Sequence, residues 1–276
     1  METQLLSYEP LTGAIGAVVT GIDLTEPQPD AVITELDRAV ADHGVLFFVD
    51  QHELTPGAQV AFGAQLGELW IHPWVRGHPD HPEVMVLAPE NLPNTPGEPI
   101  RWHADATFAA RPPRGSILRA VELPPVGGDT LWANMAAAYE SLSSSMQRFL
   151  DGLSARHVSD SFQRLLAQGK AVDAASAEMQ SSVHPVITTH PVTGRRGLYV
   201  NTIFTTEIVE LSPAEGASVL AFLYDHIKTP DLHVRWRWQP GSVAFWDNRA
   251  TQHHVTGGYT ARREMHRVTL QGDEPK

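Results

Sequence analysis

The sequence predicts a single domain whose core is mostly β, with a few flanking helices. Short apolar runs rich in β-branched and aromatic residues, such as Val45–Val49, are typical of buried strands. Between Leu232 and Trp238, apolar and polar residues alternate with the period of a strand that has one apolar face. A length of 276 residues suits one all-β barrel or sandwich. We therefore expect a closed or sandwiched β core that spans residues 1–276.

The N-terminal third is expected to place two helices between short strands. Ala14–Val19 is predicted to form the first strand. Apolar residues at helical spacing follow Pro29–Asp30, and Gly44 should end this first helix. The segment Thr55–Leu66 starts with a Thr-Pro pair, which is a common helix start. Residues 72–101 are rich in Pro, Gly, His and Asn, which indicates a long loop of the kind that is often functional.

The middle of the chain predicts two strands, a broken helix and an insert. Strands are expected over residues 116–122 and 129–133, joined by a turn rich in Pro and Gly, and a helix over 136–153 that breaks near Leu142. Residues 159–182 are rich in Gln, Ala and Ser and carry few large apolar side chains, so they lack the material for a core. We expect this segment to form a mobile helical lid.

The C-terminal third adds further strands and one long helix. His190–Arg195 is predicted to be a hairpin turn between two strands. Ser212–Pro213 should cap a helix that extends to His226. Pro240–Gly241 is a turn signal that leads into the next strand. No internal repeat or linker divides the chain, which favours one domain.

Composition narrows the classes of partner. A net charge of -12 argues against nucleic acid and anionic membranes, so an anionic small-molecule substrate would need a local basic pocket. The absence of cysteine excludes disulfides and thiolate chemistry and fits a cytoplasmic location. The N-terminus lacks the pattern of a signal peptide, and no apolar run is long enough to cross a membrane. We further expect a homo-oligomer, either a dimer or a tetramer.

A metal site is the chemistry that the sequence suggests first. His103 and Asp105 are two residues apart, so on an extended chain both side chains would point to one side. A neutral imidazole and a carboxylate suit a divalent iron, zinc or manganese ion, and His253 is our candidate for a third ligand. Two histidines and one carboxylate form the ligand set of non-haem Fe(II) oxygenases. The alternative for His103 and Asp105 is a turn with a hydrogen-bonded Asp.

Two arginines near the C-terminus indicate an anion site. If residues 263–270 form a strand, Arg263 and Arg267 share one face with a rise of roughly 13 Å between them. Buried guanidinium groups need anionic partners. The alternative is a pair of surface arginines on an edge strand.

Several motifs together resemble those of one known family. The matching motifs have the same order along the chain, and the resemblance covers nearly its whole length. The family is that of the Fe(II)- and 2-oxoglutarate-dependent dioxygenases related to taurine dioxygenase. The motifs are WHADATF at 102–108, GGDTLWAN at 127–134, WDNRATQHH at 246–254 and RREMHRVTL at 262–270.

This resemblance implies a fold, cofactors and roles for particular residues. It implies a double-stranded β-helix, the jelly-roll arrangement, with Fe(II), 2-oxoglutarate and O2 at its mouth. The iron ligands would be the three residues suggested above. Arg263 and the hydroxyl of Thr130 would bind the far carboxylate of 2-oxoglutarate. Arg267 would complete this binding site close to the iron and help to hold the anionic head of the substrate.

The substrate is less well specified by the resemblance. His72 matches a family position that hydrogen-bonds a sulfonate, and Phe162 and Phe204 match aromatic positions of the substrate pocket or are simply core residues. Val75 and Pro99 replace the Tyr and Asn of taurine-specific members. We therefore expect hydroxylation next to a sulfonate, with release of sulfite and an aldehyde and with a more apolar tail than taurine. The alternative substrate is an alkyl sulfate ester or another small anion.

Other readings of the same residues remain open at this point. His254 would point away from the metal if the chain is extended, and His266 would face opposite to the two arginines and pack in the core. A zinc hydrolase on the same three ligands would need a general base, which these motifs do not supply. A catalytically inactive binding module would not need all three ligands and both arginines.

Overall fold

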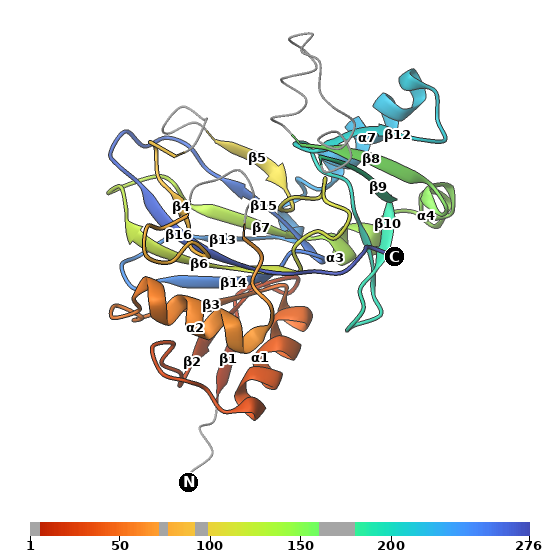
Figure 1. Ribbon diagram of the computed structural model, residues 1–276. Helices are drawn as coiled ribbons and strands as arrows, with labels where there is room; N and C mark the ends of the chain where they lie inside the picture. Colours follow the sequence, from red (N-terminus) through yellow and green to blue (C-terminus); the bar gives the residue numbers. More distant parts are fainter. Residues whose placement is uncertain (1–5, 72–76, 92–98, 160–179) are drawn as a thin grey trace.

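The core of the protein is a sandwich of two sheets. The computed structural model describes residues 6–71, 77–91, 99–159 and 180–276 (Figure 1). All strand pairs of the larger, seven-stranded sheet are antiparallel except β2 with β3. Its strand order is β1 (Ser7–Pro10), β2 (Ala17–Thr20), β3 (Val45–Phe48), β14 (Val243–Asp247), β6 (Gly115–Glu122), β16 (Glu264–Leu270) and β4 (Met85–Leu87).

A four-stranded antiparallel sheet forms the other layer of the sandwich. Large aromatic side chains fill the space between the two sheets, with the Phe47 and Trp236 rings stacked at 4.2 Å and the Trp132 and Trp246 rings 5.8 Å apart. This is the jelly-roll arrangement that the resemblance implies, and it places both metal-ligand motifs in one sheet. The strand order is β13 (His233–Trp236), β7 (Thr130–Asn134), β15 (Thr251–Val255) and β5 (Ile100–His103).

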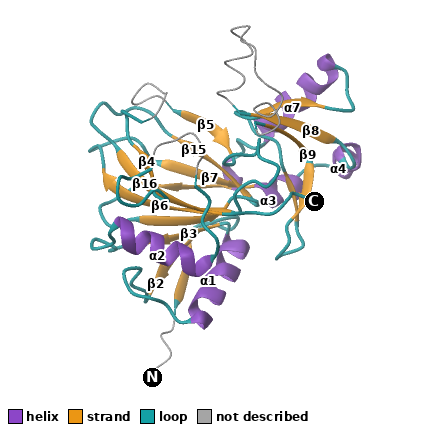
Figure 2. Cartoon of the chain, in the orientation of Figure 1, coloured by secondary structure: helices purple, strands orange, loops and turns teal. Residues whose placement is uncertain are grey.

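Two helices cover the outer face of the seven-stranded sheet, as Figure 2 shows. Helix α1 (Asp30–His43) ends at Gly44, whose φ of 74° lies in the left-handed region that favours glycine. Helix α2 (Pro56–Leu66) begins at Thr55, whose side chain accepts a hydrogen bond from Ala58 N. Leu36 and Phe62 are buried with Phe48 and Phe245 of the sheet. The sequence prediction of both helices is confirmed.

A second region packs beside the sandwich. Its apolar core brings the helices together with the short strands and with Trp102 of β5. The break predicted near Leu142 is confirmed, as are the hairpin and the long helix, which starts with a capping box formed by Ser212 and Glu215. The elements are α3 (Met135–Glu140), α4 (Ser144–Leu150), β8 (Ser154–Val158), β9 (Ser181–Pro185), β10 (Ile187–Thr189), β11 (Arg196–Leu198), β12 (Thr205–Ile208), α7 (Pro213–His226) and the 3-10 helix Pro230–Leu232.

Some sequence predictions need correction. The first strand is Ser7–Pro10 rather than Ala14–Val19, and strand β2 starts only at Ala17, after Gly16 turns the chain with a φ of 90°. The loop predicted over 72–101 contains strand β4 and the start of β5, because both find antiparallel partners in the two sheets.

The last two residues of the segment 159–182, which was predicted to form a lid, lie in a sheet. Residues 181 and 182 belong to β9 and pair with β8, so they extend a sheet instead of an insert. The backbone and the side chain of Ser159 both donate hydrogen bonds to Gln180, at 2.9 and 2.6 Å. Residues 160–179, on which the lid prediction depends, lie outside the described residues. In the part of the chain that the structure describes, no helix has the length and apolar character required to cross a membrane.

Candidate metal centre and its cavity

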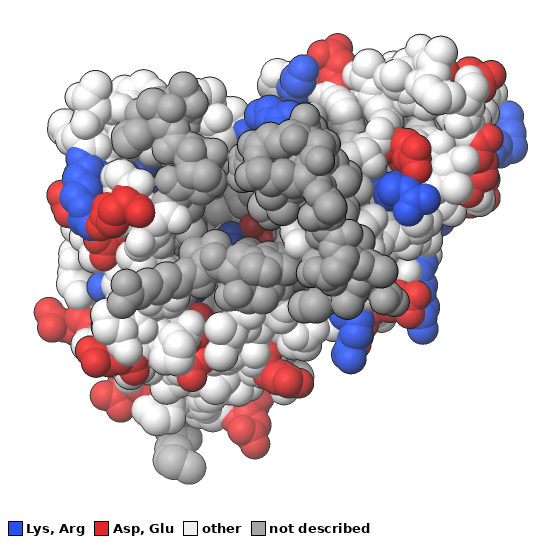
Figure 3. Space-filling model, turned by 45° about the horizontal axis from the view of Figure 1, so that its top comes forward, with Lys and Arg blue, Asp and Glu red and all other residues white. Residues whose placement is uncertain are grey.

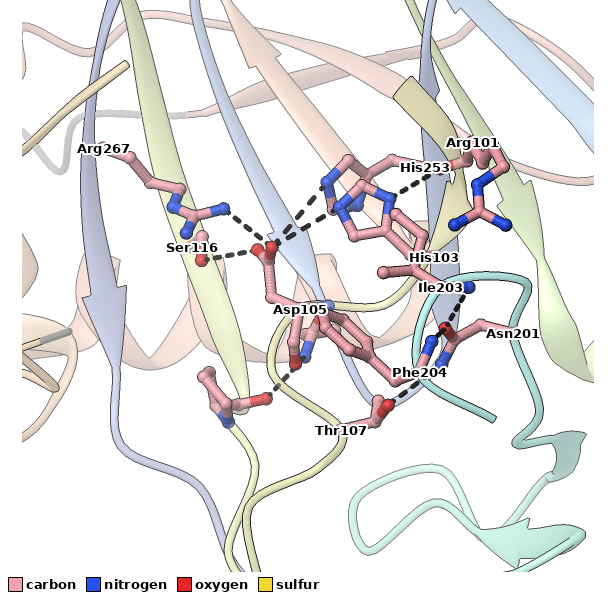
Figure 4. A network of polar contacts seen from close by, with 12 residues as sticks. Arg101, His103, Asp105, Thr107, Ser116, Asn201, Ile203, Phe204, His253 and Arg267 are labelled. Atoms are coloured by element: carbon pink, nitrogen blue, oxygen red, sulfur yellow. Dashed lines mark hydrogen bonds and ion pairs between the residues drawn. The ribbon is translucent and has the colours of Figure 1, made fainter. Parts of the chain in front are cut away.

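His103, Asp105 and His253 come together at one point of the sandwich (Figure 4). His103 is the last residue of β5, and His253 lies opposite it in β15 as its register partner. The nearest carboxylate oxygen of Asp105 lies 3.8 Å from His103 Nε2 and 3.9 Å from His253 Nε2. All three ligand atoms lie within 4.8 Å of one another, and all three residues are buried. The sequence prediction that these side chains converge is therefore met.

Asp105 reaches this point by a turn, not by the extended chain that the sequence analysis assumed. The amide of Asp105 donates to Asn248 Oδ1 at 2.7 Å, and Asn248 Nδ2 donates to the carbonyls of Asp105 and Pro113. The next residue, Ala106, has a φ of 49°, a strained value for a residue with a Cβ. Sequence reasoning missed Asn248, although it stands in the same motif as His253.

Both imidazoles are set up to act as neutral ligands. The Nδ1 of His103 donates to the carbonyl of Arg101 at 2.7 Å, which leaves the Nε2 lone pair facing Asp105. Burial lowers the pKa of His103 and lowers that of His253 further below its usual value. Neutral imidazole is the form that binds a metal ion.

The carboxylate of Asp105 is kept ionised by its neighbours. Burial would raise the pKa of Asp105, but the positive charge of Arg267 beside it holds this pKa below its usual range. Arg267 Nη1 donates to Asp105 Oδ1 at 2.7 Å, and the Ser116 hydroxyl lies 3.4 Å from Oδ2. Arg267 Nη2 also contacts Met85 Sδ at 3.1 Å. Arg267 thus lies directly beside the candidate metal ligand.

This donor set fits a divalent metal ion. The two separations of 3.8 and 3.9 Å are too long for hydrogen bonds, so the three donors face a common point without bonding to one another. Two neutral nitrogens and one anionic oxygen on one side of an ion leave its other positions open. Among the described residues no fourth His, Cys, Asp or Glu joins the group.

An anion site adjoins the three candidate ligands. Arg263 is buried, its Nε donates to the Gly128 carbonyl at 3.2 Å, and its Nη2 has no partner in the described structure. No carboxylate of the described residues pairs with it, and burial lowers the pKa of Arg263. Thr130 Oγ1 accepts a hydrogen bond from Trp238 Nε1 at 2.9 Å, so its own proton is available to a ligand. A buried cation and a free hydroxyl proton suit a carboxylate.

One cavity of about 220 Å³ connects the candidate metal ligands to this anion site. Acidic and basic atoms are visible together at the bottom of a hollow in Figure 3. Both arginines predicted to share one face line the cavity, although β16 begins one residue after Arg263. The remaining wall is mostly apolar. It is formed by Met85, Leu87, Ile100, Ala106, Phe108, Leu118, Trp132, Ile203, Phe204, Trp246 and Val255, with Thr130 as the polar exception.

The predicted substrate residues divide into two groups. The Phe204 ring lies 5.2 Å from that of Phe108 and 6.3 Å from that of His103, so Phe204 forms part of the cavity wall. Pro99 is exposed and is not among the residues that line the cavity. The other three predicted positions lie outside the described residues: His72, Val75 and Phe162.

Two further histidines lie where the sequence analysis expected them. His254 turns away from the cavity, and its ring stacks on Trp102 at a centroid distance of 5.4 Å. His266 is buried on the other side of β16, with its Nε2 2.8 Å from a Glu264 carboxylate oxygen. Neither residue lines the cavity.

The chain is similar to known dioxygenases over nearly its whole length. The family described as "Taurine catabolism dioxygenase TauD, TfdA family" matches residues 7–269 of the chain. An alpha-ketoglutarate-dependent sulfate ester dioxygenase from Pseudomonas putida is 36% identical over 281 residues, which cover 98% of this chain and 91% of that protein. An alkylsulfatase from Acinetobacter baylyi is 32% identical over 282 residues, which cover 98% and 86% of the two chains.

A solved structure extends the similarity to the fold. The crystal structure of a putative alpha-ketoglutarate-dependent taurine dioxygenase from Burkholderia xenovorans superposes with a TM-score of 0.84 at 39% sequence identity. The match covers 98% of this chain and 91% of that chain. Alpha-ketoglutarate is another name for 2-oxoglutarate.

Proposed function

Because the chain belongs to the TauD/TfdA family of dioxygenases, we propose that it oxidises alkyl sulfonates or alkyl sulfate esters at the carbon next to the sulfur-containing group. As a member of this family the chain is an oxidoreductase that depends on Fe(II), 2-oxoglutarate and O2. The observation that carries the proposal is one cavity that joins the three buried metal ligands to a buried arginine without an acidic partner among the described residues.

The residues of the cavity would divide the work between them. His103, Asp105 and His253 would hold the iron, and Arg263 with Thr130 would bind the far carboxylate of 2-oxoglutarate. With O2 as the oxidant, the bound iron and 2-oxoglutarate would supply the chemistry: one oxygen atom would go to the succinate that forms with CO2, and the other would hydroxylate a C–H bond of the substrate. The protein's own task is to orient the substrate and to limit the access of water.

The apolar wall supports an alkyl tail on the substrate. Phe108, Ile203 and Phe204 offer hydrocarbon surface, and no described residue of this wall carries a charge. Arg267 and, from the sequence, His72 would bind the anionic head. Oxidation of a sulfonate carbon gives an aldehyde and sulfite, and the same oxidation of a sulfate ester gives an aldehyde and sulfate. Both proteins compared above by sequence are named for sulfate ester or alkyl sulfate chemistry.

A competition assay tests this proposal. Each buried methylene should contribute about 0.8 kcal/mol, so pentanesulfonate and hexyl sulfate should be consumed before taurine at equal concentration. Release of sulfite or of sulfate would identify the preferred head group. Prior consumption of taurine would contradict the proposed apolar specificity.

Anaerobic titration with Fe(II) and 2-oxoglutarate separates the proposal from its alternatives. A dioxygenase should give the metal-to-ligand charge-transfer band of the chelate, whereas a zinc hydrolase or an inactive binding module should not. The single domain over residues 1–276 and the homo-oligomer remain predictions.

A further inference from the structure

The turn over residues 201–204 supplies part of the cavity wall and is hydrogen-bonded to the segment that carries His103 and Asp105, on both sides of these two ligands. It lies between β11 and β12 and presents Ile203 and Phe204 to the cavity. The backbone amides of these two residues donate to Asn201 Oδ1, at 3.1 and 2.9 Å. Asn201 N also donates to Thr205 Oγ1 at 2.9 Å. The Asn201 side chain therefore fixes the backbone from which the wall residues project.

A first hydrogen bond ties this turn to the segment that carries Asp105. Asn201 Nδ2 donates to Thr107 Oγ1 at 2.9 Å, two residues beyond Asp105 (Figure 4). Both residues are only 1% exposed, so water does not compete for this bond. Thr107 follows the strained Ala106, whose φ of 49° needs support from the surrounding structure.

A second contact ties the same turn to the strand that carries His103. The amide and the hydroxyl of Thr202 both donate to the carbonyl of Trp102, at 3.2 and 2.7 Å. Trp102 directly precedes His103. The turn is thus fastened on both sides of the two ligands, once before His103 and once after Asp105.

The Thr107 hydroxyl has both a hydrogen-bond donor and a hydrogen-bond acceptor within reach. The Asn201 amide nitrogen is only a donor, so Thr107 Oγ1 accepts from it and can give its own proton to His157 Nδ1 at 2.9 Å. His184 Nε2 lies 3.0 Å from the carbonyls of both Thr107 and Ala109 and donates to them. These contacts hold the segment after Asp105 from the side opposite the cavity.

We propose that Asn201, Thr202 and Thr107 are positioning residues that set the distance between the metal ligands and the apolar wall of the substrate cavity. Through this distance they determine how tightly consumption of 2-oxoglutarate is coupled to oxidation of the substrate. In the described structure, none of the three side chains forms a hydrogen bond with a candidate metal ligand. The inference rests on the proposed function and deepens it, because it assigns control of substrate placement to residues outside the ligand set.

The test uses pairs of variants that differ in one hydroxyl. Thr107→Val removes the tie to Asn201, and Thr202→Val removes the hydroxyl bond to Trp102 but leaves the backbone one, both at nearly constant volume. Thr107→Ser and Thr202→Ser retain these hydroxyl bonds. Thr188→Val is the matched control, because Thr188 is buried in β10 and does not line this cavity.

The expected result is a specific loss of coupling. In both Val variants the KM for the alkyl substrate should rise by about tenfold, as expected for one lost buried hydrogen bond. The amount of aldehyde per succinate should fall, whereas the KM for 2-oxoglutarate stays within about twofold of the wild type, since Arg263 is untouched. The Ser variants should restore both values. A wild-type ratio of aldehyde to succinate in the Val variants would overturn the proposal.

A measurement without cofactors provides an independent check. Hydrogen exchange of the Ile203 and Phe204 amides in the metal-free protein should accelerate in Thr107→Val but not in Thr107→Ser or in Thr188→Val. Unchanged exchange would contradict the role of Asn201 and Thr107. If the wild type lacks the charge-transfer band with Fe(II) and 2-oxoglutarate, the proposed function fails, and this exchange result still tests the positioning role separately.

Discussion

Two buried aspartates in this protein have the same kinds of partner but different geometry. Asp247, at the end of β14, lies 2.9 Å from His190 Nε2 and accepts from Arg249 Nε at 3.0 Å. Asp105 accepts from Arg267 at 2.7 Å, but its two histidine neighbours stay 3.8 and 3.9 Å away. The first cluster is closed by direct hydrogen bonds, and the second keeps a gap between its donors.

This difference in hydrogen bonding indicates which of the two clusters can bind a metal ion. The partners of Asp247 use up its lone pairs, and Asp247 Oδ1 also accepts the amide of Arg249 at 2.9 Å. Burial would raise the pKa of Asp247, but Arg249 and His190 hold it below the usual range. Around Asp105 both imidazole Nε2 atoms stay beyond hydrogen-bond distance of the carboxylate, and the Nδ1 bond of His103 leaves its Nε2 lone pair facing Asp105. A closed cluster stabilises the fold, whereas an open cluster of the same residue types is a candidate metal site.

The largest loss of activity is expected from substitutions in the open cluster around Asp105. His103→Ala, Asp105→Ala and His253→Ala should each reduce Fe(II)-dependent succinate formation below about one-hundredth of the wild type, because even loss of an outer partner costs 10- to 100-fold. His254→Ala should keep most of the activity, since His254 stacks on Trp102 outside the cavity. The opposite ranking of His253 and His254 would show that His254 is the ligand.

The closed cluster should affect stability instead. Asp247→Asn removes the charge between His190 and Arg249, and breaking a buried ion pair of this kind costs about 3 to 5 kcal/mol. Urea unfolding of the metal-free protein measures this loss. Added Mn(II) should still stabilise the folded variant, because the open cluster is intact. A variant of normal stability that has lost the response to Mn(II) would break the comparison.

A third prediction concerns the unpaired arginine beside the open cluster. Arg263→Ala should weaken 2-oxoglutarate binding by about 2 to 5 kcal/mol, because a buried charge-assisted contact to a carboxylate is lost. The KM for 2-oxoglutarate reports this effect. Arg262→Ala is the control, since Arg262 pairs with Glu90 and Glu122 at the surface.

The variant His72→Ala provides a second comparison for the effect of Arg263→Ala on 2-oxoglutarate binding. Decay of 2-oxoglutarate without substrate oxidation should survive better in His72→Ala than in Arg263→Ala. Equal effects of the two substitutions on the affinity for 2-oxoglutarate would contradict the assignment of Arg263.

Between pH 7 and pH 5, the smallest effect is expected from the buried His157, which has no acidic partner among the described residues. Burial, followed by the neighbouring His184, lowers the pKa of His157 to about 3. The unfolded chain takes up a proton below about pH 6.5 while the folded chain does not, so the stability from this group is complete above pH 6.5. It is then lost as the pH falls, by up to about 1.4 kcal/mol per unit, which amounts to about 2 kcal/mol between pH 6.5 and pH 5.

Comparison of the wild type with the variant His157→Gln isolates the contribution of His157 to the pH dependence of stability. His157→Gln should lose less stability than the wild type between pH 7 and pH 5, as measured by urea unfolding in the absence of metal. Parallel pH profiles of the two proteins would mean that His157 is protonated in the folded state as readily as in the unfolded chain.

The sequence by itself determined the local elements and the chemical inventory of the site. Helix α1 ends at Gly44 and helix α2 begins at Thr55–Pro56 because these residues favour such ends in any context. The motifs, which occur in the family's order along the chain, supplied the three candidate ligands together with Arg263 and Thr130. The structure brings all of these residues to one cavity. Such features depend on residue type and on short spacings, and both can be read from the chain.

Only the tertiary structure decided how the site is held together. The turn at Asp105 depends on Asn248, which is 143 residues away in the sequence. The negative charge of the Asp105 carboxylate is balanced by Arg267, which is 162 residues away in the sequence. The tie between Thr107 and Asn201 spans 94 residues. Whether a buried aspartate closes on its histidine, as Asp247 does, or stays open, as Asp105 does, also depends on the packing of distant strands. Residue types and local spacing do not predict these distances between atoms. The distances depend on how strands that are far apart in the sequence pair with one another.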